Sequence, residues 1–190
     1  MPNAAARPAG SIASRITLRD PDTRIRRLTA ADDAFCRALF HEHRAVQFAP
    51  LGLSGTLLQT MLDQQYQAQR IAYAQRFPDA EHGIIEQAGA AVGRLIVALG
   101  QPPDDSHDGA ASPQGCTLHL VDITIAWAAR RRGIGRDVIE GLARAGPALG
   151  ATRFTLFVLQ TNEAAQRLYE RLGFIASGDG GHILMVRKLP

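Results

Sequence analysis

The sequence has 190 residues, of which 46% are hydrophobic and 21% are charged, a composition typical of one soluble globular domain. It holds no run of about 18 apolar residues and no N-terminal apolar signal core, so we expect no membrane partner and a cytoplasmic location. The net charge of +3 gives little support to nucleic-acid binding, and the two cysteines, Cys36 and Cys116, suit neither a disulfide framework nor a zinc site.

The first half of the chain predicts a tail, a strand, two helices and a β-hairpin. Residues 1–22 show no periodicity, so we expect a disordered N-terminal tail and a single domain over residues 23–190. Thr29 is suited to cap the first helix, and Pro78 to end the second. The predicted elements are a strand at 24–28, a helix from residue 30, a helix at 56–76, and hairpin strands at 83–87 and 91–99.

The second half predicts strands that alternate with helices. A loop rich in proline, aspartate and glycine is expected over residues 101–115. The predicted elements that follow are a strand at 117–126, a helix from residue 134 that Gly146-Pro147 ends or kinks, a strand at 152–160, a helix after Asn162, and short strands at 174–176 and 182–186.

A glycine-rich turn, residues 130–135 (Arg-Arg-Arg-Gly-Ile-Gly), joins a predicted strand to a predicted helix. At such a helix start, consecutive backbone N–H groups can bind one anion, and the positive end of the helix dipole assists them. Glycine keeps side chains from separating a bulky phosphate from the backbone, and the arginines add positive charge. The turn therefore predicts a binding site for a phosphorylated cofactor.

Three kinds of phosphate loop are candidates for this turn. A dinucleotide loop requires a third glycine where Val138 stands, and the Gly-Lys-Ser/Thr ending of a nucleotide triphosphate loop is absent. The remaining pattern, R-x-x-G-x-G from Arg130 to Gly135, resembles the coenzyme A pyrophosphate loop of the GNAT superfamily of N-acetyltransferases. An ordinary strand-to-helix turn with solvated arginines is the other interpretation of this hexapeptide alone.

A second motif, Asn162 to Phe174, resembles the GNAT pattern N-x-x-A-x-x-L-Y-x-x-L-G-F. It also has a local physical reading, because Asn162 is a good N-cap and Gly173 is suited to end the helix in a left-handed conformation. Ala165, Leu168, Tyr169 and Leu172 form one apolar stripe along that helix. The two motifs occur in the order and at the separation that the superfamily has.

The resemblance implies the GNAT fold, an α/β (α+β) domain with about four helices around a central, mixed, mostly antiparallel, twisted sheet of about six to seven strands. The fourth and fifth strands of that sheet splay apart. The implied function is an acyltransferase that moves an acetyl group from acetyl-CoA, its co-substrate, to a primary amine of a small molecule, peptide or protein. The amine attacks directly in a ternary complex, and no metal takes part. A non-catalytic acyl-CoA-binding or regulatory module on the same fold is the alternative, and homodimers are frequent in the superfamily.

The resemblance also assigns roles to individual residues. Tyr169 matches the tyrosine beside the coenzyme sulfur, where a phenol of pKa about 10 is protonated and can act as general acid. His119 matches a general-base glutamate, with Asp122 or water as alternatives. Strict alternation places Asp122 on the strand face opposite His119, although a β-bulge would change that. The expected coenzyme-binding residues are Ile123, Thr124, Ile125, Arg130, Arg131, Arg132, Gly133, Ile134, Gly135, Arg136 and Asn162.

Two positions depart from the family pattern. Phe157 stands where the branch that acetylates ribosomal-protein N-termini carries a glutamate, which weakens the case for that substrate. Trp127-Ala128-Ala129 replaces a proline–acidic–aromatic turn, which alters the approach to the phosphate loop without removing its glycines. The identity of the acceptor amine is left open by the sequence.

Overall fold

A seven-stranded sheet forms the centre of the computed structural model, which describes residues 11–48, 52–100, 115–177 and 181–190. The strand order is β1-β2-β3-β4-β5-β7-β6, and only the β4–β5 pair is parallel. The strands are β1 (Thr23–Arg27), β2 (Glu81–Gln87), β3 (Ala90–Gly100), β4 (Cys116–Ile125), β5 (Ala151–Leu159), β6 (Ile175–Ser177) and β7 (His182–Lys188). The mixed, mostly antiparallel sheet expected from the sequence is confirmed.

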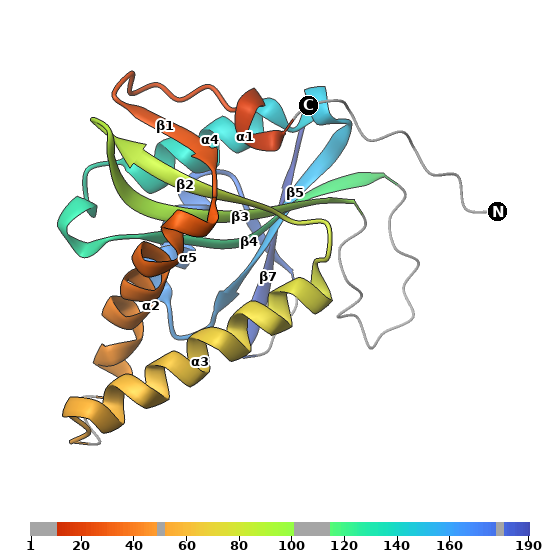
Figure 1. The fold of residues 1–190 in the computed structure, drawn as a ribbon. Coiled ribbons are helices and arrows are strands. Elements are labelled where there is room, and N and C mark those ends of the chain that lie inside the picture. Colours follow the sequence, from red (N-terminus) through yellow and green to blue (C-terminus); the bar gives the residue numbers. More distant parts are fainter. Residues whose placement is uncertain (1–10, 49–51, 101–114, 178–180) are drawn as a thin grey trace.

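Helices cover both faces of the sheet, as Figure 1 shows, with α2 and α3 in front of it and α4 behind. The helices are α1 (Ile12–Arg15), α2 (Asp33–Phe48), α3 (Gly55–Arg76), α4 (Ile134–Ala145) and α5 (Glu163–Arg171). Short 3₁₀ turns lie at η1 (Ala30–Asp32), η3 (Trp127–Ala129) and η4 (Pro147–Leu149). The last of these turns begins at Pro147, where the sequence predicted the preceding helix to end. None of the helices in the described ranges combines the length and apolar character needed to cross a bilayer.

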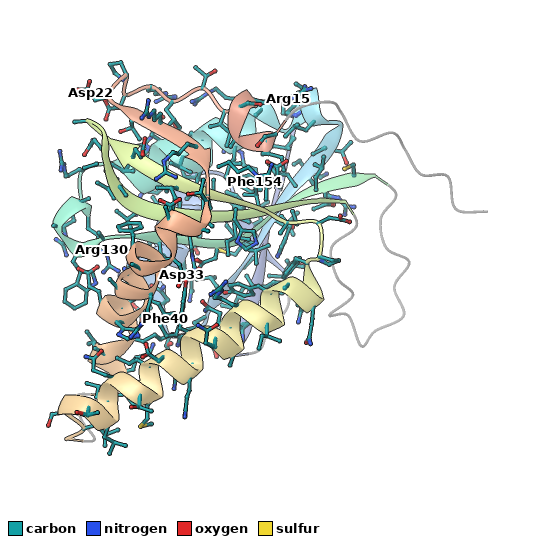
Figure 2. The ribbon with its side chains drawn as sticks, in the orientation of Figure 1. Arg15, Asp22, Asp33, Phe40, Arg130 and Phe154 are labelled. Atoms are coloured by element: carbon teal, nitrogen blue, oxygen red, sulfur yellow. The ribbon has the colours of Figure 1, made fainter. Side chains whose placement is uncertain are left out.

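Two hydrophobic cores stabilise the domain, one on each face. The larger core lies between α4, α5 and the sheet and includes Phe154 and Val138, both 0% exposed. The smaller core lies under α2 and α3, where Phe40 packs on Tyr66 with their ring centroids 5.5 Å apart. Figure 2 labels Phe154 within the sheet and Phe40 where α2 meets α3. The apolar stripe predicted for α4 is therefore its core-facing side.

The sheet opens between β4 and β5. The two strands are paired from Cys116 with Ala151 to Leu120 with Leu156. Beyond that point β4 continues to Ile125 and β5 to Leu159, and the register shows no further pairs between these described segments. The splay that the resemblance implied between the fourth and fifth strands is thus present, and it leaves a gap at the centre of the sheet.

A β-bulge in β4 changes which side chains face this gap. Ile96 of β3 pairs with Asp122, and its neighbour Val97 pairs with Leu120, so Val121 is an extra residue in β4. The inserted residue places Asp122 on the same sheet face as His119. Strict alternation alone would place the two residues on opposite faces, and the β-bulge that the sequence left as the alternative is the arrangement found.

The N-terminal strap, which we define as residues 11–22, packs against the domain. Ile12 is only 4% exposed, and its amide donates to Glu81 Oε2 at 2.7 Å. Further along, the Arg19 amide donates to Asp137 Oδ2 of α4 at 2.8 Å. A disordered tail was expected over residues 1–22. That expectation fails for the strap because its widely spaced apolar residues reach the core without forming a periodic pattern, whereas residues 1–10 lie outside the described residues.

Candidate functional site

The glycine-rich turn leads from the end of β4, through η3, into α4. Arg131 has a φ of 59° and Gly133 a φ of 84°, both in the left-handed region. The Gly133 carbonyl accepts the Asp137 amide at 3.0 Å, which begins the helix and leaves the first-turn amides without partners inside the helix. A Cβ on Gly135 would meet only Ile125 Cγ1, at 3.9 Å. Packing within the protein therefore does not require glycine at 135, whereas a ligand seated on the helix start does.

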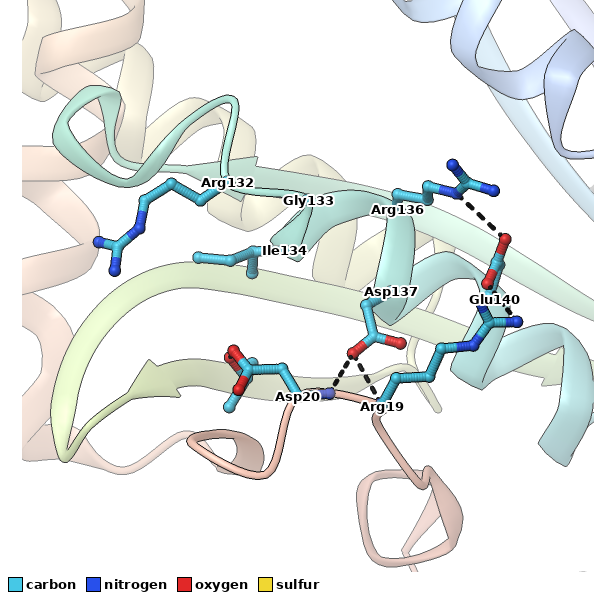
Figure 3. A pocket seen from close by; sticks show the side chains of 9 residues that line it. Arg19, Asp20, Arg132, Gly133, Ile134, Arg136, Asp137 and Glu140 are labelled. Atoms are coloured by element: carbon cyan, nitrogen blue, oxygen red, sulfur yellow. Dashed lines mark hydrogen bonds and ion pairs between the residues drawn. The ribbon is translucent and has the colours of Figure 1, made fainter.

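A hollow of about 330 Å³ lies beside the start of α4, between that helix and the strap (Figure 3). Arg132 and Arg136 line it, together with two carboxylates of α4. Glu140 accepts from Arg136 Nε at 3.2 Å and from Arg19 Nη2 at 3.0 Å. Because Glu140 already pairs with Arg136 and Arg19, the hollow suits a phosphate less well than the exposed first-turn amides do.

Arg130, expected to add charge to the phosphate loop, is instead tied to the end of β4. Its Nε donates to the Ile125 carbonyl at 3.2 Å, and its guanidinium lies over the Trp127 ring at 5.6 Å. Its Nη2 lies 2.7 Å from His43 Nδ1, and His43 Nε2 lies 3.0 Å from the Ile125 carbonyl. Burial lowers the pKa of His43, and a neutral ring satisfies both contacts by accepting at Nδ1 and donating from Nε2.

At the end of β4, the backbone amides and carbonyls of successive residues point alternately toward β3 and toward the gap. The Ala126 amide donates to the Val92 carbonyl on the β3 side. In an antiparallel pair every second residue bonds to the same neighbour, so the amides and carbonyls of Ile123 and Ile125 point away from β3. Those of Thr124 point toward β3. The three residues were expected to bind the coenzyme together, but the backbone of Thr124 is used within the sheet.

The gap between β4 and β5 is continuous with a cavity of about 460 Å³, which we call the central hollow. His119, Asp122, Phe157 and Tyr169 line it, so the bulge and α5 bring the predicted catalytic residues to one place. A second cavity of about 260 Å³, the side hollow, lies toward α2 and α3. Residues that line both cavities are Asp122, Leu159 and Asn162.

His119 is held rigidly in the wall of the central hollow. It is 4% exposed, and its Nδ1 lies 2.8 Å from Thr155 Oγ1 on β5. Its ring stacks on Phe77, with centroids 5.3 Å apart, and meets Phe157 edge-on at 5.7 Å. These contacts fix the orientation of the ring in the wall of the central hollow.

Tyr169 lies on α5, opposite the β4 wall of the central hollow, and is 9% exposed. Burial, with a smaller contribution from the Asp122 charge, raises the pKa of Tyr169 to about 12. Asn162 begins this helix, because its Oδ1 accepts the Ala165 amide at 3.2 Å as the sequence predicted. The same asparagine lines both hollows, so the cap of α5 belongs to the cavity wall.

An ion pair between Arg94 of β3 and Asp122 is the part of the site that sequence reasoning missed. Arg94 Nη2 lies 2.7 Å from Asp122 Oδ2, and the side chains are 8% and 19% exposed. Arg94 Nη2 also donates to Gln69 Oε1 at 3.2 Å. An arginine inside the apolar run from Val92 to Leu99 was the available signal, because a charge in such a strand requires a partner. Within the part of the chain that the structure describes, no group of His, Cys, Asp and Glu is arranged to hold a metal ion.

One comparison with known proteins identifies a family. The sequence model of the acetyltransferase (GNAT) family matches residues 51–174. A search of curated proteins finds no match.

Solved structures with the same fold include three acetyltransferases. The PaiA N-acetyltransferase of Thermoplasma acidophilum, in complex with coenzyme A, is 15% identical with a TM-score of 0.61, covering 87% of this chain and 98% of its own. An acetyltransferase of Thermus thermophilus is 23% identical with a TM-score of 0.58, covering 88% and 97%. RimL, a ribosomal L7/L12 alpha-N-protein acetyltransferase in complex with coenzyme A, is 14% identical with a TM-score of 0.61, covering 92% and 97%. At these identities the likeness shows a shared fold.

Proposed function

Because this chain belongs to the GNAT acetyltransferase family, we propose that it is an N-acetyltransferase that moves an acetyl group from acetyl-CoA to a primary amine. One observation carries the proposal. The gap between β4 and β5 opens into a single cavity lined by His119, Asp122 and Tyr169, and the chain leads from the end of β4 through η3 to the glycine-rich start of α4. The proposed phosphate-binding amides and the proposed proton-transfer groups therefore lie on either side of one strand end.

The residues at the end of β4 and the start of α4 fit the coenzyme. The first-turn amides of α4 and the unfilled space over Gly135 suit the diphosphate, and each charge-assisted hydrogen bond is worth about 1.5–3 kcal/mol. The backbone of Ile123 faces the gap and suits an extended arm that adds to β4 like a strand. The Ile125 carbonyl already accepts from His43 and Arg130, so its amide is the group on offer there.

Acetyl-CoA supplies a thioester, an acyl group already activated for transfer to an amine. Tyr169 donates its phenolic proton toward the sulfur, and with a pKa of about 12 it is protonated at every pH near neutrality. An ordinary thiol has a pKa of about 8.5, so full transfer from this phenol is uphill. Tyr169 therefore acts first by donating a hydrogen bond to the developing thiolate. It acts as general acid only if another group reprotonates its phenol as the proton leaves.

His119 is the proposed base for the amine proton, acting directly or through one water. It lines the central hollow, and Thr155 and Phe77 fix its ring. Asp122 is the competitor on the same face, but its charge is already balanced by Arg94. We propose direct attack without an acyl-enzyme, since burial raises the pKa of the Cys36 and Cys116 thiols and makes both poor nucleophiles.

The test combines calorimetric titration of acetyl-CoA with measurement of coenzyme release over a panel of amines. Wild type should bind acetyl-CoA and release coenzyme with at least one amine. Tyr169→Phe should lower kcat by about 10²–10⁴-fold with little change in acetyl-CoA affinity. Tyr66→Phe, in the smaller core, is the matched control and should retain activity. Binding without turnover on any amine would instead favour the non-catalytic acyl-CoA-binding module.

A further inference from the structure

The charges around the two hollows are unbalanced. Among the described residues that line them, Asp122 is the one carboxylate, and Arg94 already pairs with it at 2.7 Å. The side hollow is also lined by Arg44 and by the neutral amides of Gln47 and Gln69. Beyond the ion pair, this part of the cavity therefore carries net positive charge.

Arg44 of α2 supplies that charge. Its Nη1 donates to the neutral Gln47 Oε1 at 3.0 Å, and its guanidinium lies over the Phe40 ring at 5.6 Å. Within the described ranges no carboxylate forms an ion pair with it. Arg37, on the same helix, differs because its Nε lies 2.6 Å from Asp63 Oδ1. Arg44 is thus a positioned guanidinium that can take a carboxylate from a ligand.

Asp122 lies where the two hollows meet and can receive the other end of such a ligand. Its hydrogen bonds from Arg94 Nη2, Arg94 Nε and Thr124 Oγ1, at 2.7, 3.2 and 3.3 Å, all fall on Oδ2. Oδ1 can therefore accept from an ammonium group that enters the central hollow. This position lies in the same cavity as His119 and Tyr169, where the amine must arrive to react.

From this arrangement we propose that the acceptor is a small zwitterion of the amino acid type, a primary amine and a carboxylate on one molecule. The ammonium group meets Asp122 in the central hollow, and the carboxylate meets Arg44 in the side hollow. The central hollow, at about 460 Å³, and the side hollow, at about 260 Å³, share Asp122 in their walls, so one molecule can extend into both. This inference rests on the proposed acetyl transfer and adds the chemical class of the acceptor.

The same charges disfavour a polyamine. Each further ammonium group of a polycation would lie near Arg44 or Arg94 instead of a carboxylate, and like charges in a partly desolvated cavity repel strongly. The decarboxylated amine of an amino acid would leave Arg44 without a partner. Both comparisons predict that the carboxylate of the acceptor determines selectivity.

The experiment measures coenzyme release with the twenty amino acids, and then with the amide and the decarboxylated amine of each active one, alongside spermidine. We expect kcat/KM to be about tenfold to a hundredfold higher for the amino acid than for its amide or amine. Arg44→Gln should remove that preference, because it should lower kcat/KM for the amino acid much more than for the decarboxylated amine. Arg44→Lys should restore part of the preference, and Arg37→Gln should alter nothing.

Each outcome decides between the alternatives. Spermidine or the amides reacting at least as well as the amino acids would overturn the zwitterion proposal while the acetyltransferase assignment stands. A uniform loss with every amine in Arg44→Gln would also overturn it, since that pattern indicates a structural role. If acetyl-CoA binds and no amine of the panel releases coenzyme, the proposed function fails and this inference fails with it.

Discussion

Two glycines at the start of α4 allow backbone strain to be separated from ligand binding. Gly135 lies in helical backbone, where a Cβ would meet only Ile125 Cγ1, at 3.9 Å. Gly133 has a φ of 84°, and a Cβ there would meet nothing within 4 Å but would be held in the left-handed region. Alanine at position 135 should therefore stabilise the protein, whereas alanine at position 133 should destabilise it. If the coenzyme lies over both glycines, both replacements should weaken its binding.

The magnitudes follow from these environments. Gly135→Ala should raise the free energy of unfolding by about 0.5–1 kcal/mol, because alanine loses less backbone entropy in a helix. Gly133→Ala should lower it by about 1–2 kcal/mol, the cost of a left-handed L-residue. In either variant the methyl group would hold the diphosphate away from the amides. Loss of one charge-assisted hydrogen bond, worth about 1.5–3 kcal/mol, weakens binding by about tenfold to 150-fold.

Urea denaturation followed by circular dichroism gives the stabilities, and calorimetric titration gives the Kd for acetyl-CoA. Gly150→Ala is the matched control, because Gly150 has a φ of 79° and equally open surroundings away from the start of α4. It should lose about as much stability as Gly133→Ala and bind acetyl-CoA normally. A more stable Gly135→Ala protein with an unchanged Kd would refute the placement of the diphosphate on this helix start.

Three further predictions concern the scaffold. Arg94→Met should lower the free energy of unfolding by about 2–3 kcal/mol, because Asp122 loses its counter-charge, and adding Asp122→Asn should restore most of it. Gly141→Ala should cost about 1–3 kcal/mol and open the strap to trypsin, because its Cβ would lie 2.7 Å from a side chain of the strap. Hydrogen bonds from Arg26, and to a smaller extent from Arg24, hold the pKa of Glu86 below its ordinary value. The stability from Glu86 is therefore complete above about pH 4.3 and is lost as the pH falls through the lowered pKa, so Arg26→Gln should flatten the acid limb of a stability–pH curve.

Urea denaturation measures the stability of Arg94→Met, and limited trypsin digestion tests the strap in Gly141→Ala. Urea denaturation repeated between about pH 6 and pH 2 tests Arg26→Gln. Wild-type stability in Arg94→Met would show that water, instead of the guanidinium, balances Asp122. An unchanged digestion pattern in Gly141→Ala would contradict the packing of the strap on α4. Arg26 also pairs with Asp32, so an acid limb of unchanged slope in Arg26→Gln would remove both Glu86 and Asp32 as sources of the pH dependence.

Local patterns in the sequence predicted the elements that depend on neighbouring residues. Asn162 caps α5 and Gly173 follows it with a φ of 81°, both as expected, because capping and helix termination involve residues only a few positions apart. The strand before the glycine turn and the helix after it were predicted for the same reason. The placement of Tyr169 in the central hollow also followed, since the α5 stripe fixes the direction of its side chain.

Features that depend on distant partners were not predictable in this way. The bulge at Val121 adds one residue to a long strand-forming segment, and no local pattern marks its position. The Arg94–Asp122 pair joins residues on two strands through their register, which the sequence does not display. The strap was missed because Ile12 and its apolar neighbours have no helical or strand period, although they reach the core.

The sheet consists of two antiparallel groups joined by one short parallel seam, the five residue pairs between β4 and β5. The hairpin β2–β3 closes through a tight turn, whereas the seam requires chain segments separated by all of α4 to meet. We therefore expect the seam to form later than the hairpin, and until it forms both strands expose edges that another chain can join. Weakened docking of α4 should then reveal itself first as self-association of refolding intermediates, before the finished protein loses any catalytic competence.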